Sequence, residues 1–187
     1  LIVNIGHDVV EKPPFYMEPD GRTVIHINYK AAEVDQVYFP QLEVIGDIAG
    51  SVERLGNRLR GKHPSDPAAY ANVHEDIAAH IRQGSDDGRF PMVPQRIVAD
   101  VRAVMGRDDI VALDNGIYKI WFARNYIAHE PNTILLDNAL ATMGAGLPSA
   151  MMAAMLSPER RVLAVCGDGG FMMNSQEVET AVRLGLN

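Results

Sequence analysis

The sequence is poor in cysteine and in clustered positive charge, and each of these two shortages excludes a class of function. One of the 187 residues is cysteine, Cys166, which excludes an internal disulfide and a cysteine-based metal cluster. Aromatic residues make up 6%, and 17 Lys and Arg stand against 24 Asp and Glu, for a net charge of -7. An acidic chain without a basic run does not attract a nucleic-acid backbone, so we expect no nucleic-acid partner.

Long hydrophobic runs are also missing. The opening segment LIVNIGHDVV is apolar, but it is too short to span a bilayer, lacks a basic leader and reaches charge at Asp8. We therefore expect no membrane association, and the single cysteine favours the cytoplasm. Because the chain opens on Leu1 inside an apolar run and stops at Asn187 directly after a helical pattern, we expect it to be an internal piece of a longer polypeptide.

Short apolar runs alternate with helical patterns along most of the chain. Strands are expected at 1–5, 23–28, 42–45, 110–113, 133–136 and 162–166, and helices at 48–59 and from about residues 94, 117, 148 and 175. Asp47 is the expected N-cap of the first helix. Strands that alternate with helices predict parallel pairing, and thus a doubly wound α/β fold made of two partial Rossmann-like units.

The composition between Gly61 and Met92 differs from that of the flanking segments. It is rich in Pro, Ser, Asp and Gly, which indicates a linker, with a short helix expected at 70–81. The predicted organisation is therefore one unit at 1–60, a linker at 61–92 and a second unit at 93–187.

The strongest local motif is an apolar strand that runs into Gly167, Asp168, Gly169 and Gly170, followed by a helix that we expect to open at Asn174 or Ser175. Glycines let backbone amides approach a phosphate, and a helix N-terminus adds partial positive charge. Asp168 would repel a bare diphosphate, so it fits this place if it holds Mg²⁺. The alternative is that Asp168 is a turn or capping residue, since the tripeptide GDG is common in turns.

Two other strand ends have a similar character. The strand at 110–113 ends in Asp114-Asn115-Gly116, and the strand at 133–136 runs into DNALATMGAGLPSAMMAAM. In parallel sheets ligands bind beyond the carboxyl ends of the strands, so these segments are candidate site residues. Close packing of a core helix that begins near Pro148 also accounts for the small residues of the second segment.

Taken together, VALDNGIYKIWFAR, LATMGAGLPSAMMAA and AVCGDGGFMMNSQEVETAVRLGLN resemble three successive blocks of the thiamine diphosphate-binding domain of the acetolactate synthase (acetohydroxyacid synthase large subunit) family. The first 60 residues resemble the rear half of that family's middle domain, through LIVNIG, TVIHIN and LEVIGDIAGSVERL. The resemblance implies thiamine diphosphate and Mg²⁺ as cofactors and pyruvate as substrate. Pyruvate would be decarboxylated and condensed with a second 2-oxo acid, in a homo-oligomer with the active site at a subunit interface.

The resemblance also implies roles for single residues at the diphosphate. Asp168 would ligate Mg²⁺, and the backbone around Gly167, Gly169 and Gly170 would contact the diphosphate. Asn115 and Gly116 match the family's other diphosphate loop. Ile117 and Tyr118 follow there, where most relatives have polar side chains, and Lys119 is an alternative contact.

Two further residues would act on the thiamine part of the cofactor. Met143 matches the bulky apolar residue that holds thiamine bent, so that its amino group lies near the reactive carbon, which makes Met143 the candidate catalytic residue. Ala141 would offer its backbone carbonyl to the aminopyrimidine.

The resemblance also indicates what this chain does not contain. The family's activating Glu and its second metal-binding Asn match no residue here, so we expect the chain alone to be inactive and to bind the cofactor weakly or not at all. The segment GHDVVEKPP lacks the Arg-Phe-Asp-Asp type of loop that accompanies FAD, which disfavours FAD. Alternatives are another thiamine diphosphate enzyme, such as a glyoxylate carboligase, pyruvate oxidase or 2-oxo acid decarboxylase, or a non-catalytic paralogue.

Overall fold

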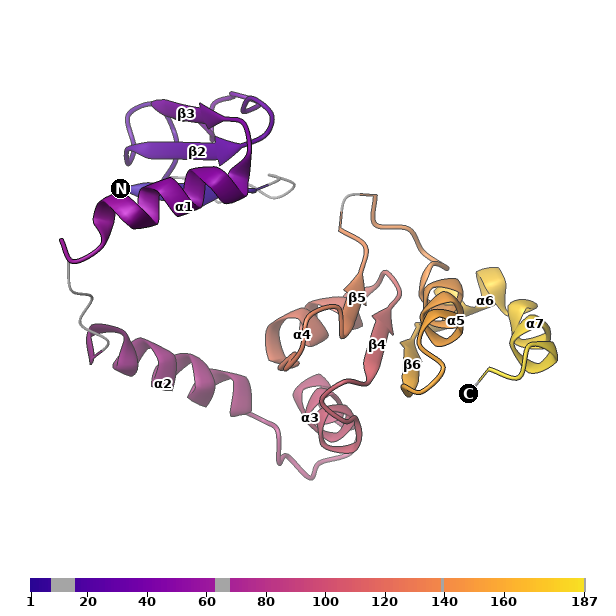
Figure 1. Cartoon of the computed structure of the whole chain (residues 1–187). Helices are drawn as coiled ribbons and strands as arrows, with labels where there is room; N and C mark the ends of the chain where they lie inside the picture. Colours follow the sequence, from indigo (N-terminus) through magenta and orange to yellow (C-terminus); the bar gives the residue numbers. More distant parts are fainter. Residues whose placement is uncertain (8–15, 63–67, 139, 187) are drawn as a thin grey trace. The chain divides into compact units, whose positions relative to one another are not determined.

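The computed structural model describes residues 1–7, 16–62, 68–138 and 140–186, which form two compact units, Leu1–Asp66 and Pro67–Asn187 (Figure 1). Each unit contains a three-stranded parallel sheet with flanking helices, which confirms the α/β, Rossmann-like prediction. The expectation about FAD depends on the segment GHDVVEKPP at 6–14, of which residues 8–14 lie outside the described residues.

The first unit is built on strands β1 (Ile2–Ile5), β2 (Val24–Asn28) and β3 (Leu42–Ile45), which pair in that order. Its buried core is small: Met17, Val24 and Tyr38 form one cluster, and Ile27 of β2 is also buried. Helix α1 (Ile48–Leu59) has the predicted bounds, and the Asp47 carboxylate caps it by accepting a hydrogen bond from the Gly50 amide at 2.5 Å. Within the described residues no side chain of α1 is fully buried, so its predicted apolar face is only partly covered.

The second unit contains the remaining elements. In chain order they are α2 (Ala68–Arg82), α3 (Pro94–Val104), β4 (Ile110–Leu113), α4 (Ile117–Asn125), β5 (Ile134–Leu136), α5 (Gly146–Leu156), β6 (Val162–Val165), α6 (Asp168–Asn174) and α7 (Glu177–Arg183). The sheet has the order β5-β4-β6, with all pairs parallel. The central strand β4 is therefore hydrogen-bonded on both sides, and all four of its residues are buried.

Helices cover both faces of this sheet. Helices α3 and α4 lie on one side and α5 lies on the other (Figure 1). Val98 and Phe122 from the first pair pack against Val111 and Leu113 of β4. The buried Ala150 and Ala153 let α5 pack closely against β4 and β6. This arrangement brings the carboxyl ends of β4, β5 and β6 to one edge of the sheet.

The glycine motif after β6 differs from its prediction. We expected a glycine turn with a helix opening at Asn174 or Ser175, and this was wrong. Helix α6 begins at Asp168, directly after Gly167, and the next helix, α7, begins at Glu177. The buried Gly170 lies against the segment after β4, and this close packing outweighs the poor helix propensity of glycine.

Helix α2 is longer than the predicted 70–81 and belongs to the second unit, where it lies against α4. The Asn125 side chain of α4 donates a hydrogen bond to the Ile81 carbonyl at 3.2 Å. Within the described ranges, no helix combines the length and the apolar character needed to cross a membrane.

Candidate functional site

The candidate site lies where β4 and β6 end, and the buried Asp114 organises it. Asp114 directly follows β4 and is 1% exposed. Its two carboxylate oxygens accept hydrogen bonds from the Gly144 amide at 2.8 and 3.0 Å, and one of them also accepts from the Asn115 amide at 2.6 Å. A buried carboxylate needs such partners, so Asp114 connects the end of β4 to the loop before α5.

Two glycines pack directly against Asp114. A Cβ at Gly146 would lie 2.6 Å from the Asp114 Cβ, and a Cβ at Gly170 would lie 2.1 Å from its Oδ2. Neither position has room for a side chain, so the first turns of α5 and α6 both lie against the end of β4. Sequence reasoning named Gly170 as a diphosphate contact and placed Asp114 in a candidate site segment, but gave Asp114 no role of its own. The available signal was its place directly after the most buried strand.

The loop that precedes α5 carries two of the predicted cofactor residues. The Asn115 side-chain amide donates a hydrogen bond to the Ala141 carbonyl at 2.5 Å. Met143 is 46% exposed, and its Cε lies 3.3 Å from the place that a Cβ on Gly169 would occupy. The structure therefore brings Asn115, Ala141, Met143 and Gly169 to one place.

Asp168 and the backbone beside it are open to a ligand. Asp168 is the first residue of α6 and is exposed, and its carboxylate makes no hydrogen bond or ion pair with any described residue. The first hydrogen bond of the helix runs from the Phe171 amide to the Gly167 carbonyl, so the amides of residues 168–170 have no partner inside the helix.

This donor set fits a metal ion that is shared with a diphosphate. Mg²⁺ is usually held by one or two carboxylates together with phosphate oxygens and water, and free helix amides favour an anion. The described residues contain no group of three His, Cys, Asp or Glu side chains that could hold a metal by themselves. The bound anion would therefore have to supply part of the coordination.

Tyr118 lies between the two predicted diphosphate segments. A Cβ on Gly116 or on Gly167 would come within 2.5 or 2.9 Å of its ring, so the ring packs on both backbones. Its hydroxyl is buried and has no hydrogen-bond partner among the described residues. Burial raises the pKa of Tyr118. The Gly167 backbone lowers the pKa of Tyr118, although it forms no hydrogen bond of normal geometry with the hydroxyl. Negative charges at Asp114, Cys166 and Asp168 raise this pKa further.

Two neighbours of the site have roles that need no ligand. The Lys119 ammonium donates a hydrogen bond to the Asp137 carbonyl, at the end of β5. Burial, and then the charge of Asp114, raise the pKa of the Cys166 thiol against a lowering effect of the Leu147 backbone.

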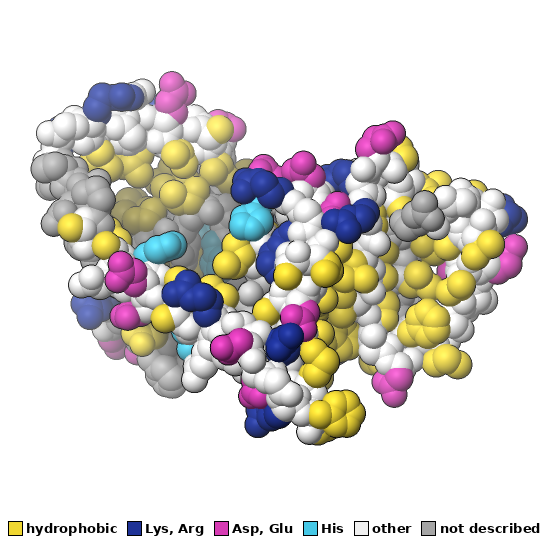
Figure 2. Space-filling view, turned by 90° about the horizontal axis from the view of Figure 1, so that it is seen from below, with side chains coloured by type: hydrophobic (Ala, Val, Ile, Leu, Met, Phe, Trp, Pro, Cys, Tyr) yellow, Lys and Arg dark blue, Asp and Glu magenta, His cyan; other side chains and the backbone are white. Residues whose placement is uncertain are grey.

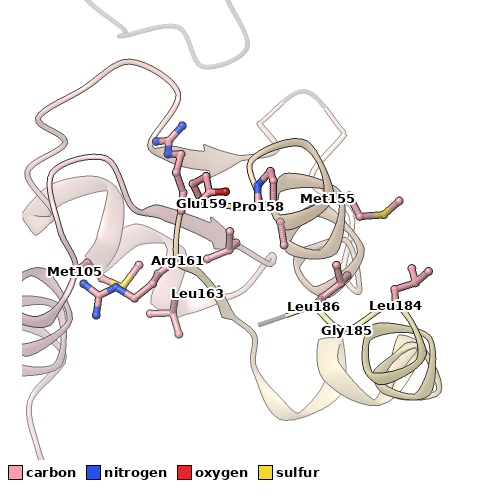
Figure 3. Close-up of a pocket in the computed structure, with 12 residues that line it drawn as sticks. Met105, Met155, Pro158, Glu159, Arg161, Leu163, Leu184, Gly185 and Leu186 are labelled. Atoms are coloured by element: carbon pink, nitrogen blue, oxygen red, sulfur yellow. The ribbon is translucent and has the colours of Figure 1, made fainter.

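A pocket away from the candidate site lies beside the start of β6 (Figure 3). It measures about 760 Å³, and Met105, Arg161, Leu163 and Leu186 are among the residues that line it. None of the predicted site residues does so. A smaller pocket of about 400 Å³ lies at the carboxyl ends of β4 and β5 and includes Asp137.

Comparisons with known proteins identify one matching family and several relatives of the chain. Residues 114–187 match the family described as thiamine pyrophosphate enzyme, C-terminal TPP binding domain. The chain is 34% identical, over its whole length, to a catabolic acetolactate synthase from Raoultella terrigena and covers 34% of that protein. It is 31% identical over 98% of its length to an acetolactate synthase from Bacillus subtilis, of which it covers 33%. Over 84% of its length it is 28% identical to the acetolactate synthase isozyme 1 large subunit from Escherichia coli, of which it covers 28%. The chain thus spans about a third of the length of these curated relatives.

Proposed function

Because residues 114–187 match the thiamine pyrophosphate enzyme family and the chain is similar along its length to acetolactate synthases, we propose that it is part of a thiamine diphosphate-dependent acetolactate synthase. The reaction would decarboxylate pyruvate and condense the product with a second 2-oxo acid, giving 2-acetolactate and CO₂ when both are pyruvate. The observation that carries the proposal is the exposed Asp168 carboxylate at the start of α6, whose first-turn amides have no partner inside the helix and which lies next to Met143 through Gly169.

Each residue of the site has a role in this proposal. Asp168 holds Mg²⁺, the first-turn amides of α6 bind the diphosphate, and Gly116 lines the second diphosphate loop. The Ala141 carbonyl accepts a hydrogen bond from the aminopyrimidine, and Met143 supports the thiamine from the side of Gly169. Thiamine diphosphate, when bound, supplies the carbon nucleophile and accepts the electrons that decarboxylation releases.

The remaining expectations belong to the same proposal. The absence of an Arg-Phe-Asp-Asp type of loop from GHDVVEKPP supports a flavin-free enzyme. We place it in the cytoplasm as a homo-oligomer with its active site at a subunit interface, without nucleic acid or membrane partners. The 187-residue chain alone would lack activity.

Calorimetric titration tests the cofactor role of Asp168. Thiamine diphosphate is titrated, with and without Mg²⁺, into the longest native polypeptide that contains these residues and into its Asp168→Ala variant. We expect metal-dependent binding that the variant loses, because it loses the carboxylate that holds the ion. Asp137→Ala is the matched control, since Asp137 is exposed at the same edge and engages Lys119 through its backbone carbonyl. Equal binding by the Asp168→Ala variant would contradict the assignment.

A non-catalytic paralogue is the second candidate, and two residues favour it. Ile117 is 71% exposed beside the predicted diphosphate loop, and the neighbouring Tyr118 buries its hydroxyl. Neither offers a polar group to the diphosphate from the surface. Cofactor binding without turnover of pyruvate, glyoxylate or an aryl-substituted 2-oxo acid would favour this candidate, whereas turnover of one of them would identify the activity.

A further inference from the structure

The Asn115 side chain joins two loops that lie 26 residues apart in the sequence. Asn115 follows Asp114 at the end of β4, and its Nδ2 donates a hydrogen bond to the Ala141 carbonyl at 2.5 Å. This is the carbonyl to which the proposed function assigns the cofactor's aminopyrimidine. The side chain thus engages the loop that faces the thiamine part of the cofactor.

The loop at 140–143 has few other attachments. Leu140 is 82% exposed and Met143 is 46% exposed. Besides the contact with Asn115, residues 140–143 make one local hydrogen bond among the described residues, which the Thr142 hydroxyl donates to the Leu140 carbonyl. The next residue, Gly144, is held on both sides: its amide donates to Asp114, and its carbonyl accepts from Asn174. The direction of the Ala141 carbonyl therefore depends on Asn115.

We propose that Asn115 is a positioning residue for the aminopyrimidine, acting through the Ala141 carbonyl and not on the diphosphate. This inference rests on the proposed function. A carbonyl oxygen has two lone pairs, so one accepts from Asn115 while the other remains for the amino group of the cofactor. Orienting the carbonyl before the cofactor arrives lowers the ordering cost of binding. Gly116 keeps its place in the diphosphate loop.

The experiment compares two ligands that differ by one amino group. Thiamine diphosphate and its analogue with hydrogen in place of the pyrimidine amino group are titrated with Mg²⁺ into the native polypeptide and into its Asn115→Ala and Asn115→Asp variants. Asn125→Ala is the matched control, because that side chain also donates to a backbone carbonyl, of Ile81, but lies away from the site. Far-UV circular dichroism and thermal unfolding verify that each variant is folded.

We expect Asn115→Ala to weaken binding of thiamine diphosphate about fivefold, the ratio that loss of one net hydrogen bond produces. Binding of the analogue should change less than about twofold, since the analogue has no amino group to present to Ala141. Asn115→Asp should weaken the binding of thiamine diphosphate at least as much, because a carboxylate cannot donate a hydrogen bond to the Ala141 carbonyl and repels its oxygen. Asn125→Ala should leave the binding of both ligands unchanged.

Other outcomes separate this inference from the proposed function. Equal weakening of both ligands by Asn115→Ala would mean that Asn115 contacts the diphosphate, and unchanged binding of both would mean that it has no role. Either result overturns the inference while leaving the cofactor assignment in place. If the unsubstituted polypeptide binds neither ligand, the proposed function fails and the inference fails with it.

Discussion

Replacing Gly170 with alanine places a methyl group against the buried Asp114 carboxylate. The new Cβ would lie 2.1 Å from Oδ2 and 2.9 Å from Cγ, closer than heavy atoms approach without displacement. The carboxylate cannot move freely, because the amides of Gly144 and Asn115 hold it. Gly170→Ala is therefore expected to destabilise the second unit.

The size of this effect follows from three contributions. Overpacking a filled site costs about 1–3 kcal/mol. A hydrogen bond to a charged group is worth about 1.5–3 kcal/mol, and moving the carboxylate weakens at least one. In the opposite direction, replacing glycine with alanine inside a helix stabilises the fold by about 1 kcal/mol. We expect the free energy of unfolding to fall by about 2–4 kcal/mol.

Urea unfolding followed by fluorescence of the single Trp121 measures this loss, because Trp121 packs on the core of the second unit. Gly169→Ala is the matched control. There the new methyl group meets only the mobile end of Met143 at 3.3 Å, and the helix propensity of alanine should leave stability unchanged or slightly raised. Equal urea midpoints for the two glycine variants would refute the reasoning.

A double variant isolates the contact between Gly170 and Asp114. In an Asp114→Ala background the added methyl group no longer meets a carboxylate, so Gly170→Ala should cost less than in the unsubstituted chain. Additive losses from the two substitutions would mean that the methyl group destabilises the unit by another route.

Two further substitutions test the electrostatics of the second unit. Tyr118→Phe removes a buried hydroxyl that has no partner, so the free energy of unfolding should stay the same or rise by up to about 2 kcal/mol; a loss above roughly 0.5 kcal/mol in urea would reveal a partner. Burial alone would raise the pKa of Asp109, but hydrogen bonds from the Gly106 amide and Arg161, with the charge of Arg161, outweigh it and hold the pKa below the ordinary 3.8. The carboxylate therefore stabilises the fold above that ordinary value and loses its effect as the pH falls through the lower folded pKa. Asp109→Asn should be less stable than the unsubstituted chain near neutral pH, with a difference that shrinks below about pH 4; a difference constant down to about pH 3 would contradict this.

The secondary structure could be predicted well where local patterns determine it. Strand β4 and helix α1 have the predicted bounds, because an apolar run and a regular spacing of apolar residues are readable without knowledge of the tertiary contacts. The parallel pairing followed from the alternation of strands and helices. The conserved handedness of such crossovers limits the alternatives.

The start of α6 could not be predicted because it depends on a contact between distant segments. Glycine has a poor helix propensity, and Gly169 with Gly170 therefore indicated a turn. In the folded chain Gly170 lies against Asp114, 56 positions earlier in the sequence, and only glycine fits there. The same reason hid the role of Asp114, because its partner Gly144 lies in another loop.

For the candidate site, the resemblance supplied positions but not contacts. It placed Asn115 and Ala141 in separate parts of the cofactor site, and the hydrogen bond between them became visible only in the folded chain. It also placed Tyr118 at a position where most relatives are polar, without indicating that its hydroxyl would be enclosed.

The two-sided attachment of Gly144 makes its amide a natural reporter. Its N–H is held by the Asp114 carboxylate, and its carbonyl accepts from the Asn174 side chain at 2.6 Å. Loop amides usually exchange their hydrogens quickly with solvent, whereas an amide held in this way exchanges only when the local structure opens. Hydrogen exchange at this one position would therefore time the opening of the contact between the loop and the Asp114 carboxylate at the end of β4, separately from the unfolding of the sheet.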